Sequence, residues 1–331
     1  MLSATLLTAL AAGPGTPAGT AATAASTAQS RSQSVPPPPG PSTTPEPRKE
    51  TADGYVLVWH DEFNTNGPLN PDDWIFETGF VRNQEAQWYQ SDNAVCGDGY
   101  LVIEARKETQ PNPRYIPPAG GSTSSTAPSA TGRGARGGTA WPNLPTITIT
   151  SASVTTRGKH SWTYGRFEIR ARIDTRPGSW PAFWTLGTTG GWPAGGEIDI
   201  MEYYADTVLA NVAWAGVNGT AWNTGRTALA KLPADFSSDF HTWRMDWDAA
   251  SIKLFLDDNL VNQQDLARTV NAGRGPLAGQ NPFVDKPEYL LLNQAIGGQN
   301  GGDYSQTGFP IRYYIDYVRV YQKPSPATTR P

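Results

Sequence analysis

The chain has 331 residues and a formal net charge of −4, and its Lys and Arg residues form no basic block. This balance argues against a surface built to bind nucleic acid or an anionic membrane. The single cysteine, Cys96, excludes an internal disulfide. Twelve Trp and thirteen Tyr beside three His favour a carbohydrate-binding surface over a metal- or histidine-based site, because aromatic rings offer broad amphipathic contact areas.

Residues 1–50 differ in composition from the rest of the chain. Residues 2–12 are short, mostly apolar and end in small residues, so we expect the core of a secretory signal there, although no basic residue precedes it. This run is too short to span a bilayer. Residues 13–50 are rich in Pro, Ala, Ser and Thr and predict a disordered linker. We therefore expect a secreted or periplasmic, monomeric protein with one domain at 51–323 and a disordered tail at 324–331.

The domain opens with strand and turn patterns. Residues 55–59 and 74–76 are strand candidates separated by Asn-Gly-Pro and Asn-Pro-Asp turn signals. In the next segment, 83–89, alternate polar residues would share one face of a strand; they are Asn83, Glu85, Gln87 and Tyr89. A plain solvent-facing strand would show the same pattern. Residues 99–105 then predict a buried strand.

Residues 108–146 interrupt this pattern, because Pro, Gly, Ser, Thr and Arg dominate there. Long structureless loops in compact domains are usually functional or disordered. The insertion therefore either overhangs one end of a cleft and shapes the choice of ligand, or is an unstructured addition.

Strand patterns return after the insertion. Residues 147–156 are β-rich, and residues 162–173 alternate strictly between apolar and charged positions. On the charged face, Arg166 either pairs with an acid near a cleft or is solvated. Residues 240–258 predict a hairpin in which His241 has a structural role. Strands recurring with scarcely any helical period predict an all-β sandwich.

The stretch 197–204 reads Glu-Ile-Asp-Ile-Met-Glu-Tyr-Tyr and carries three acids. On a regular strand Glu197 and Asp199 share one face, whereas Glu202 has the wrong parity. One extra residue at Ile200–Met201, a β-bulge, would return Glu202 to the acidic face. Crowded carboxylates spread their pKa values apart, so one stays protonated while another ionises. That division suits glycosidic bond hydrolysis, although a solvated acidic edge strand remains the simpler reading.

This acidic strand follows Trp-Pro-Ala-Phe-Trp at 180–184, and together the two motifs resemble glycoside hydrolase family 16, the laminarinase, lichenase and agarase group. The extra Met201 is similar to the bulged branch of that family. The resemblance implies a jelly-roll β-sandwich of two curved antiparallel sheets with a concave substrate cleft, and a retaining mechanism. It further implies that Glu197 is the nucleophile, Glu202 the general acid/base and Asp199 the acid that tunes them.

Other segments are also similar to this family. They are the Asp-Glu-Phe run at 61–63, the polar segment 83–89, Tyr-Gly-Arg-Phe-Glu at 164–168 and Leu-Leu-Leu-Asn at 290–293. From these segments and the nearby aromatic residues we expect the substrate to contact Asn83, Glu85, Gln87, Trp88, Arg166, Trp180, Trp184, Trp192, Trp214, Asn293 and Gln294. The chain departs from the laminarinase pattern near Trp214, where those proteins usually have a His.

The resemblance also implies a structural calcium away from the cleft, with Glu62, a backbone oxygen near Gly99, and Asp316 as candidate ligands. Oxygen donors suit this hard cation, but plain surface carboxylates explain the same residues. We expect no cofactor in catalysis.

Three functions remain open from the sequence. The first is an endo-glycosidase that hydrolyses β-1,3-glucan or mixed-linkage glucan. The second keeps the fold and the chemistry but acts on a galactan such as agar or porphyran, and Trp214 keeps this alternative open. The third is a non-catalytic carbohydrate-binding protein, against which the three mutually repelling acids argue.

Overall fold

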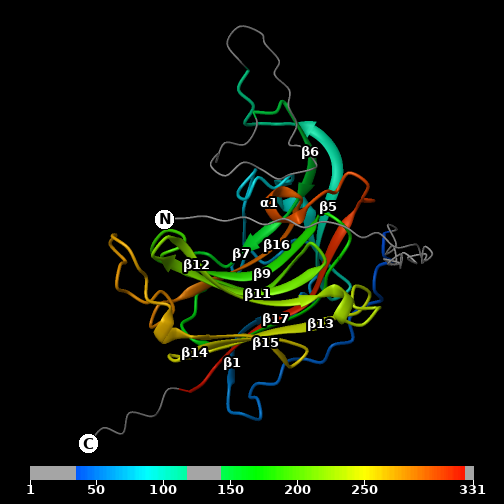
Figure 1. The fold of residues 1–331 in the computed structure, drawn as a ribbon. Coiled ribbons are helices and arrows are strands. Elements are labelled where there is room, and N and C mark those ends of the chain that lie inside the picture. Colours follow the sequence, from blue (N-terminus) through cyan, green and yellow to red (C-terminus); the bar gives the residue numbers. More distant parts are fainter. Residues whose placement is uncertain (1–34, 118–142, 325–331) are drawn as a thin grey trace, which may run out of the picture. The chain divides into compact units, whose positions relative to one another are not determined.

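A computed structural model describes residues 35–117 and 143–324, which form two packed β-sheets (Figure 1). The larger sheet has the order β15-β14-β13-β8-β17-β5-β6-β3, with β1 paired to β17 and β4 to β5. Its strands are β1 (Val56–Asp61), β3 (Trp88–Tyr89), β4 (Ala94–Gly97), β5 (Tyr100–Pro111), β6 (Thr146–Ser151), β8 (Gly165–Arg172), β13 (His241–Trp247), β14 (Ser251–Leu256), β15 (Asn259–Asp265) and β17 (Ile311–Gln322).

The smaller sheet has the order β12-β11-β10-β9-β16-β7-β2. Its strands are β2 (Ile75–Phe76), β7 (Ser153–Thr155), β9 (Ser179–Gly187), β10 (Glu197–Tyr204), β11 (Thr207–Gly216), β12 (Gly219–Ala228) and β16 (Glu288–Ile296). Within the described residues, all strand pairs are antiparallel except β3 with β6. Helical structure there is limited to α1 (Gly298–Gly301) and three 3-10 turns at Ser91–Asn93, Leu229–Lys231 and Leu266–Arg268. The predicted all-β jelly-roll sandwich is confirmed.

The hydrophobic core lies between the two sheets. Alternation along each strand sends one set of side chains inward: Ile198 and Ile200 come from β10, and Phe167 and Ile169 from β8. The hairpin predicted at 240–258 is confirmed as β13 and β14, and its Trp243 and Trp247 are buried in this core. His241 is structural, as expected, because its ring bonds Asp257 and the carbonyl of Phe236.

The linker expected at 13–50 differs from the structure over residues 35–50, which have fixed contacts on the larger sheet. Arg172 donates to the carbonyl oxygen of Pro37 at 2.8 Å, and Arg319 donates to that of Pro45 at 3.0 Å. Ser42 donates to the Asp316 carboxylate at 2.5 Å. Composition alone misses this docking, because its hydrogen bonds are made with two arginines and an aspartate that lie more than a hundred residues away.

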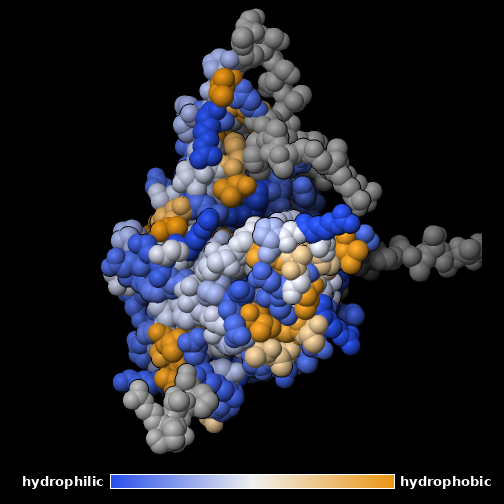
Figure 2. Space-filling view, turned by 90° about the vertical axis from the view of Figure 1, so that its left-hand side faces the viewer, coloured by the Kyte–Doolittle hydropathy of each residue, from blue (hydrophilic) through white to orange (hydrophobic). Residues whose placement is uncertain are grey.

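Several expectations concern residues outside the described part. The signal proposed at 2–12 and most of the expected tail lie there, as does 118–142 of the expected insertion. Strands β5 and β6 take up the two ends of that insertion, pairing as far as Pro111 with Thr146. In the part of the chain that the structure describes, no helix has the length and hydropathy needed to cross a bilayer. On the face shown in Figure 2, hydrophobic residues form separate patches among hydrophilic ones.

Candidate active site

The predicted bulge in β10 is confirmed by the pairing of its neighbours. Asp199 pairs with Trp184 of β9, and Met201 pairs with the next residue, Phe183, so β10 contains one extra residue. The register against β11 shifts over the same interval. As a result Ile200 and Met201 both face the core, and Glu202 returns to the side of Asp199.

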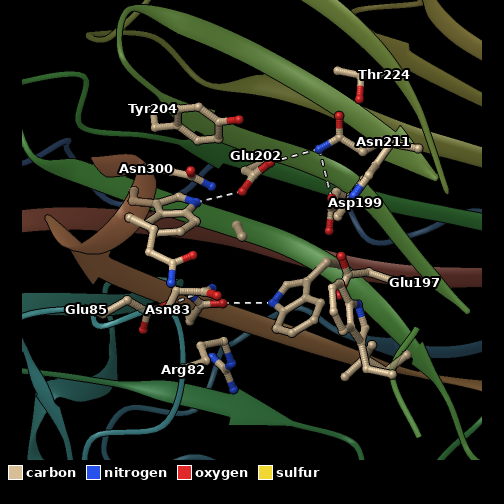
Figure 3. A pocket seen from close by; sticks show the side chains of 18 of the residues that line it. Arg82, Asn83, Glu85, Glu197, Asp199, Glu202, Tyr204, Asn211, Thr224 and Asn300 are labelled. Carbon is tan, nitrogen blue, oxygen red and sulfur yellow. Dashed lines mark hydrogen bonds between the residues drawn. The ribbon is translucent and has the colours of Figure 1, made fainter. Parts of the chain in front are cut away.

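All three acids line a cleft of about 730 Å³ on the face of the smaller sheet that is turned away from the core. In Figure 3, Glu197, Asp199 and Glu202 lie along one side of this cleft, and Arg82, Asn83 and Glu85 lie across from them. The full lining consists of Arg82, Asn83, Glu85, Trp180, Ala182, Trp184, Leu186, Trp192, Glu197, Asp199, Glu202, Tyr204, Asn211, Trp222, Thr224, Arg226, Asn293, Gln299 and Asn300.

Asn211 of β11 joins two of the acids. Its Nδ2 donates to Asp199 Oδ2 and to Glu202 Oε2, each at 2.8 Å, so these two carboxylate oxygens cannot lie farther apart than twice that distance (Figure 3). Trp180 Nε1 donates to the other oxygen of Glu202 at 2.7 Å. Glu202 is therefore held from both sides, and its carboxyl plane is fixed relative to the cleft.

Burial in this cleft makes all three acids hold protons more tightly than usual. Desolvation raises the pKa of Glu202 to about 8, repulsion from Asp199 adds to the effect, and the bonds from Trp180 and Asn211 oppose it. Desolvation raises the pKa of Asp199 to about 7, again opposed by Asn211. For Glu197, desolvation and then repulsion from Asp199 and Glu202 raise the pKa well above its ordinary value.

These three sites titrate together, so the protons belong to the cluster. While Asp199 and Glu202 hold protons, the like-charge repulsion on Glu197 disappears; burial still favours its proton, whereas a hydrogen bond from Trp192 and the charge of Arg82 favour its ionised form. Glu197 and Glu202 are both partly exposed to the cleft, and Asn211 and Trp180 hold Glu202 in place. The arrangement can therefore present one carboxylate and one carboxylic acid to the same ligand.

Four Trp side chains line the cleft around the acids. The sequence predicted three of them, Trp180, Trp184 and Trp192, but not Trp222. Trp180 and Trp184 are nearly buried in the wall, and Trp184 donates to Asn293 Oδ1 at 2.8 Å. Trp192 is 58% exposed and lies 6.4 Å from Trp222, which is 48% exposed. Exposed indole faces at a cleft rim are suited to stacking on sugar rings.

The opposite wall contains the expected Asn83 and Glu85, although only Trp88–Tyr89 of that segment forms a strand. Glu85 accepts hydrogen bonds from Asn83 at 3.2 Å, from Gln87 at 2.8 Å and from Tyr89 at 3.0 Å. The polar side chains of 83–89 therefore do gather on one side: Asn83 and Glu85 line the cleft, whereas Gln87 and Tyr89 support Glu85 without lining it.

Five of the predicted substrate contacts lie away from the cleft. Gln87 is buried and its Oε1 accepts from the backbone of Ile296, and Gln294 is buried against Ser179. Trp88 is buried edge-on to Phe80. These three side chains are buried and do not line the cleft.

Arg166 and Trp214 are the two larger corrections. Arg166 belongs to β8 of the other sheet and bonds Asp246 at 2.7 and 3.0 Å, so its partner is a surface acid. Trp214 packs against the core, because the cleft-facing positions of β11 are Asn211 and Ala213, which pair with Asp199 and Glu197. The expectation that Trp214 takes the place of a cleft His was thus wrong: the residue at the cleft-facing position is Ala213.

The three proposed calcium ligands do not fit a metal site. Arg319 donates to both oxygens of Glu62 at 2.9 and 2.7 Å, and Arg170 donates to Asp316 at 2.5 Å. Gly99 packs against Ser42, which also donates to Asp316. The charge that a cation would satisfy is already matched by arginine. Among the residues described, no three His, Cys, Asp or Glu gather as a metal-binding group.

Several cleft residues were missed by sequence reasoning, notably Arg82, Asn211, Trp222 and Arg226. Asn211 could have been predicted from the sequence. A hairpin turn at Ala205–Asp206 pairs Asn211 with Asp199 on the neighbouring strand, so locating that turn would have placed Asn211 beside the acids.

Comparison with known proteins agrees with this geometry. Residues 85–284, more than half of the chain, match the family described as glycosyl hydrolases family 16. A beta-glucanase of Rhodothermus marinus is 35% identical over 293 residues, which cover 83% of this chain and 88% of the relative. The chain belongs to glycoside hydrolase family 16.

Two further members of family 16 extend the comparison. A glucan endo-1,3-beta-glucosidase of Cryptopygus antarcticus is 35% identical over 74% of this chain and 81% of its own. The laminarinase catalytic domain of Thermotoga maritima has 32% identity and a TM-score of 0.64, over 82% of this chain and all of that domain. The protein is a glycoside hydrolase of this family, and the third possibility, a non-catalytic binding protein, is set aside.

Proposed function

We propose that this family 16 hydrolase cleaves β-1,3-glucan at internal linkages, with mixed-linkage β-glucan as a second substrate of the same site. The observation that carries the proposal is the bulge in β10, which brings Glu202 into one cleft with Glu197 and Asp199. The β-glucanase and laminarinase relatives support this class of polymer. The exposed Trp192 and Trp222 offer stacking surfaces for sugar rings beyond the acids.

In the proposed reaction Glu197 attacks the anomeric carbon and displaces the glycosidic oxygen. Glu202, whose pKa of about 8 keeps it protonated near neutrality, gives its proton to that oxygen. Glu202 is then a carboxylate and takes a proton from water, which attacks the anomeric carbon and releases Glu197. Two displacements at one carbon retain its configuration.

Asp199 acts between the two glutamates in this proposal. Its bond from Asn211 and its proton limit the negative charge next to Glu197 and Glu202. Once Glu197 is esterified its charge is gone, repulsion on Glu202 falls, and the lower pKa suits its second role as a base.

The test measures release of reducing ends from laminarin, lichenan, agarose and porphyran. We expect laminarin and lichenan to be cleaved, with the β-anomer as the first product detected by proton NMR. Turnover on agarose alone would contradict the proposed substrate. The galactan alternative rested on the missing laminarinase His near Trp214; Trp214 packs against the core and the cleft-facing position is Ala213, so turnover on agarose or porphyran remains the outcome that would favour it.

The variant Glu197→Gln tests the assigned nucleophile. We expect it to lose essentially all turnover while still binding laminarin in affinity electrophoresis, because the amide keeps the shape of the side chain but cannot attack. Retained turnover would reassign the nucleophile.

Export and oligomeric state complete the proposal. A polymeric substrate is met outside the cytoplasm, so we propose that residues 2–12 direct secretion and that the exported enzyme is a monomer. Sequencing the N-terminus of protein recovered from the medium and measuring its mass by light scattering test both points.

A further inference from the structure

Glu288, the first residue of β16, is a completely buried acid that the proposed reaction does not use. Its backbone N–H and carbonyl bond those of Trp162, each at 2.9 Å, so its position is fixed. Its side chain points into the interior beside Gly196, the residue that precedes β10. Pro282 and Phe283 also pack against Gly196. A carboxylate in such a place is costly unless it is matched by charge or by hydrogen bonds.

The hydrogen bonds of Thr185 show how this acid is accommodated. Thr185 Oγ1 lies within hydrogen-bond distance of Glu288 Oε2 and also 3.5 Å from the carbonyl oxygen of Ile198. A hydroxyl has one proton, so it cannot make a full-strength hydrogen bond to both acceptors at once. Both contacts are satisfied only when Glu288 Oε2 carries a proton and donates it to Thr185, which then donates to Ile198.

The other oxygen of the same carboxyl points to the same conclusion. Glu288 Oε1 is buried and has no hydrogen-bond partner. A methyl group placed on Gly196 would lie 3.2 Å from it, so this oxygen rests against the residue that precedes Glu197. In that position the unpaired carbonyl oxygen of a neutral carboxylic acid is tolerable. An ionised carboxylate would place part of its negative charge on the same unpaired oxygen, at a much larger free-energy cost.

We propose that Glu288 is a positioning residue for the hydrolysis: as a neutral acid it supports the catalytic strand through Thr185 and the carbonyl of Ile198. Ile198 lies between Glu197 and Asp199, so this support reaches the segment that carries two of the three acids. When Glu288 ionises, Thr185 turns to it, the bond to Ile198 is lost and the start of β10 is released.

The groups around Glu288 set the pH at which this happens. Burial raises its pKa to about 8, with a further contribution from the charge of Asp199 on β10 and an opposing bond from Thr185 on β9. Gly196, Pro282 and Phe283, which also face it, are uncharged. The release therefore belongs to mildly alkaline pH and adds to the loss of the Glu202 proton, which falls in the same range.

The test uses Glu288→Gln in the full chain. Glutamine is neutral at every pH, and its amide N–H can donate to Thr185 as the acid does. The first readout is the pH dependence of kcat/KM on laminarin. This readout rests on the proposed glucan hydrolysis. Near pH 6 we expect the variant to stay within about twofold of the wild type. In the alkaline limb, log kcat/KM should fall more steeply in the wild type than in the variant, with a difference in slope approaching roughly 1 for the one additional proton lost.

A second readout does not depend on activity. The melting temperature of the wild type should fall more steeply than that of Glu288→Gln between about pH 5 and pH 9, because only the wild type loses this buried proton. Laminarin left uncleaved would count against the proposed substrate alone, and the melting comparison would still decide the role of Glu288. Superimposable melting and activity profiles would overturn the inference.

Thr185→Val provides an independent variant with Thr185→Ser as its matched control. Valine has the same shape but no hydroxyl, so we expect a lower kcat with little change in KM even at pH 6. Serine keeps the hydroxyl and should restore kcat. Equal kcat in the valine and serine variants would remove Thr185 from the proposed chain of hydrogen bonds and with it the inference.

Discussion

The bridge made by Asn211 gives the sharpest test of how the acids are tuned. Asn211→Ala removes two hydrogen bonds of 2.8 Å at once, one to Asp199 and one to Glu202. The bond from Trp180 to Glu202 remains, so the proposed general acid loses one of its two supports. The substitution adds no charge to the cleft, and it removes a buried carbonyl oxygen, Asn211 Oδ1, that has no partner.

The magnitude follows from the charge that Glu202 acquires. After it has given up its proton it is a carboxylate, and a hydrogen bond to a charged group contributes about 1.5–3 kcal/mol. Losing one such bond in the transition state lowers kcat/KM by roughly 10- to 150-fold. The bonds from Asn211 also lower the pKa values of Asp199 and Glu202. Both pKa values should therefore rise in the variant. The alkaline limb of its pH–activity profile should then lie at higher pH than the wild-type limb near pH 8.

The assay is kcat/KM on laminarin from about pH 5 to pH 10, with Thr224→Ala as the matched control. Thr224 pairs with Asn211 across β11 and β12 and lines the same cleft. Losing its hydroxyl should leave the alkaline limb in place. A variant lacking Asn211 that keeps wild-type kcat/KM, or whose alkaline limb moves to lower pH, would refute the reasoning.

Three further predictions follow from the same geometry. Trp180→Phe removes the 2.7 Å bond to Glu202 and should lower kcat/KM by roughly 10- to 150-fold, for a loss of about 1.5–3 kcal/mol, in initial-rate measurements. Gly196→Ala puts a side chain at φ 86° and should destabilise the fold by about 1–3 kcal/mol in urea unfolding, whereas Gly191→Ala, with open space around it, should cost far less. Asp199 and Glu202 have raised folded-state pKa values of about 7 and 8, so their stabilisation is complete below the unfolded pKa near 4 and is lost as pH rises through those values; calorimetric melting temperatures should decline accordingly.

Strand parity explains what the sequence could predict about this site. Glu202 stands five positions after Glu197, which is the wrong face for a regular strand, and the only local remedy is one extra residue. The structure has that residue at Ile200–Met201, where both side chains are apolar and both are buried. The bulge could be predicted from the sequence because an acid stood at a position that, in a regular strand, would face the hydrophobic core.

The same reasoning failed where no such contradiction exists. Trp214 was placed in the cleft, but a strand of small and apolar residues carries no sign of which face is inward, and a shift of one residue exchanges the faces. Register is set by the partner strand, which pairs Ala213 with Glu197. Likewise Arg166 looks the same in sequence whether its partner is a cleft acid or Asp246, because that choice depends on which sheet β8 joins.

Burial links the stability of this sheet to its chemistry. Three acids on one strand, with Glu288 behind them, would repel one another in water-like surroundings, and the fold contains them by keeping protons on the cluster. A general acid must hold a proton at working pH, so in the proposed reaction the desolvation that makes β10 costly to fold also prepares Glu202 to donate its proton. It follows that substitutions which neutralise Asp199 or Glu202 should raise the melting temperature above neutral pH while they lower turnover. Such opposite responses are expected of a site whose stored electrostatic cost is part of its mechanism.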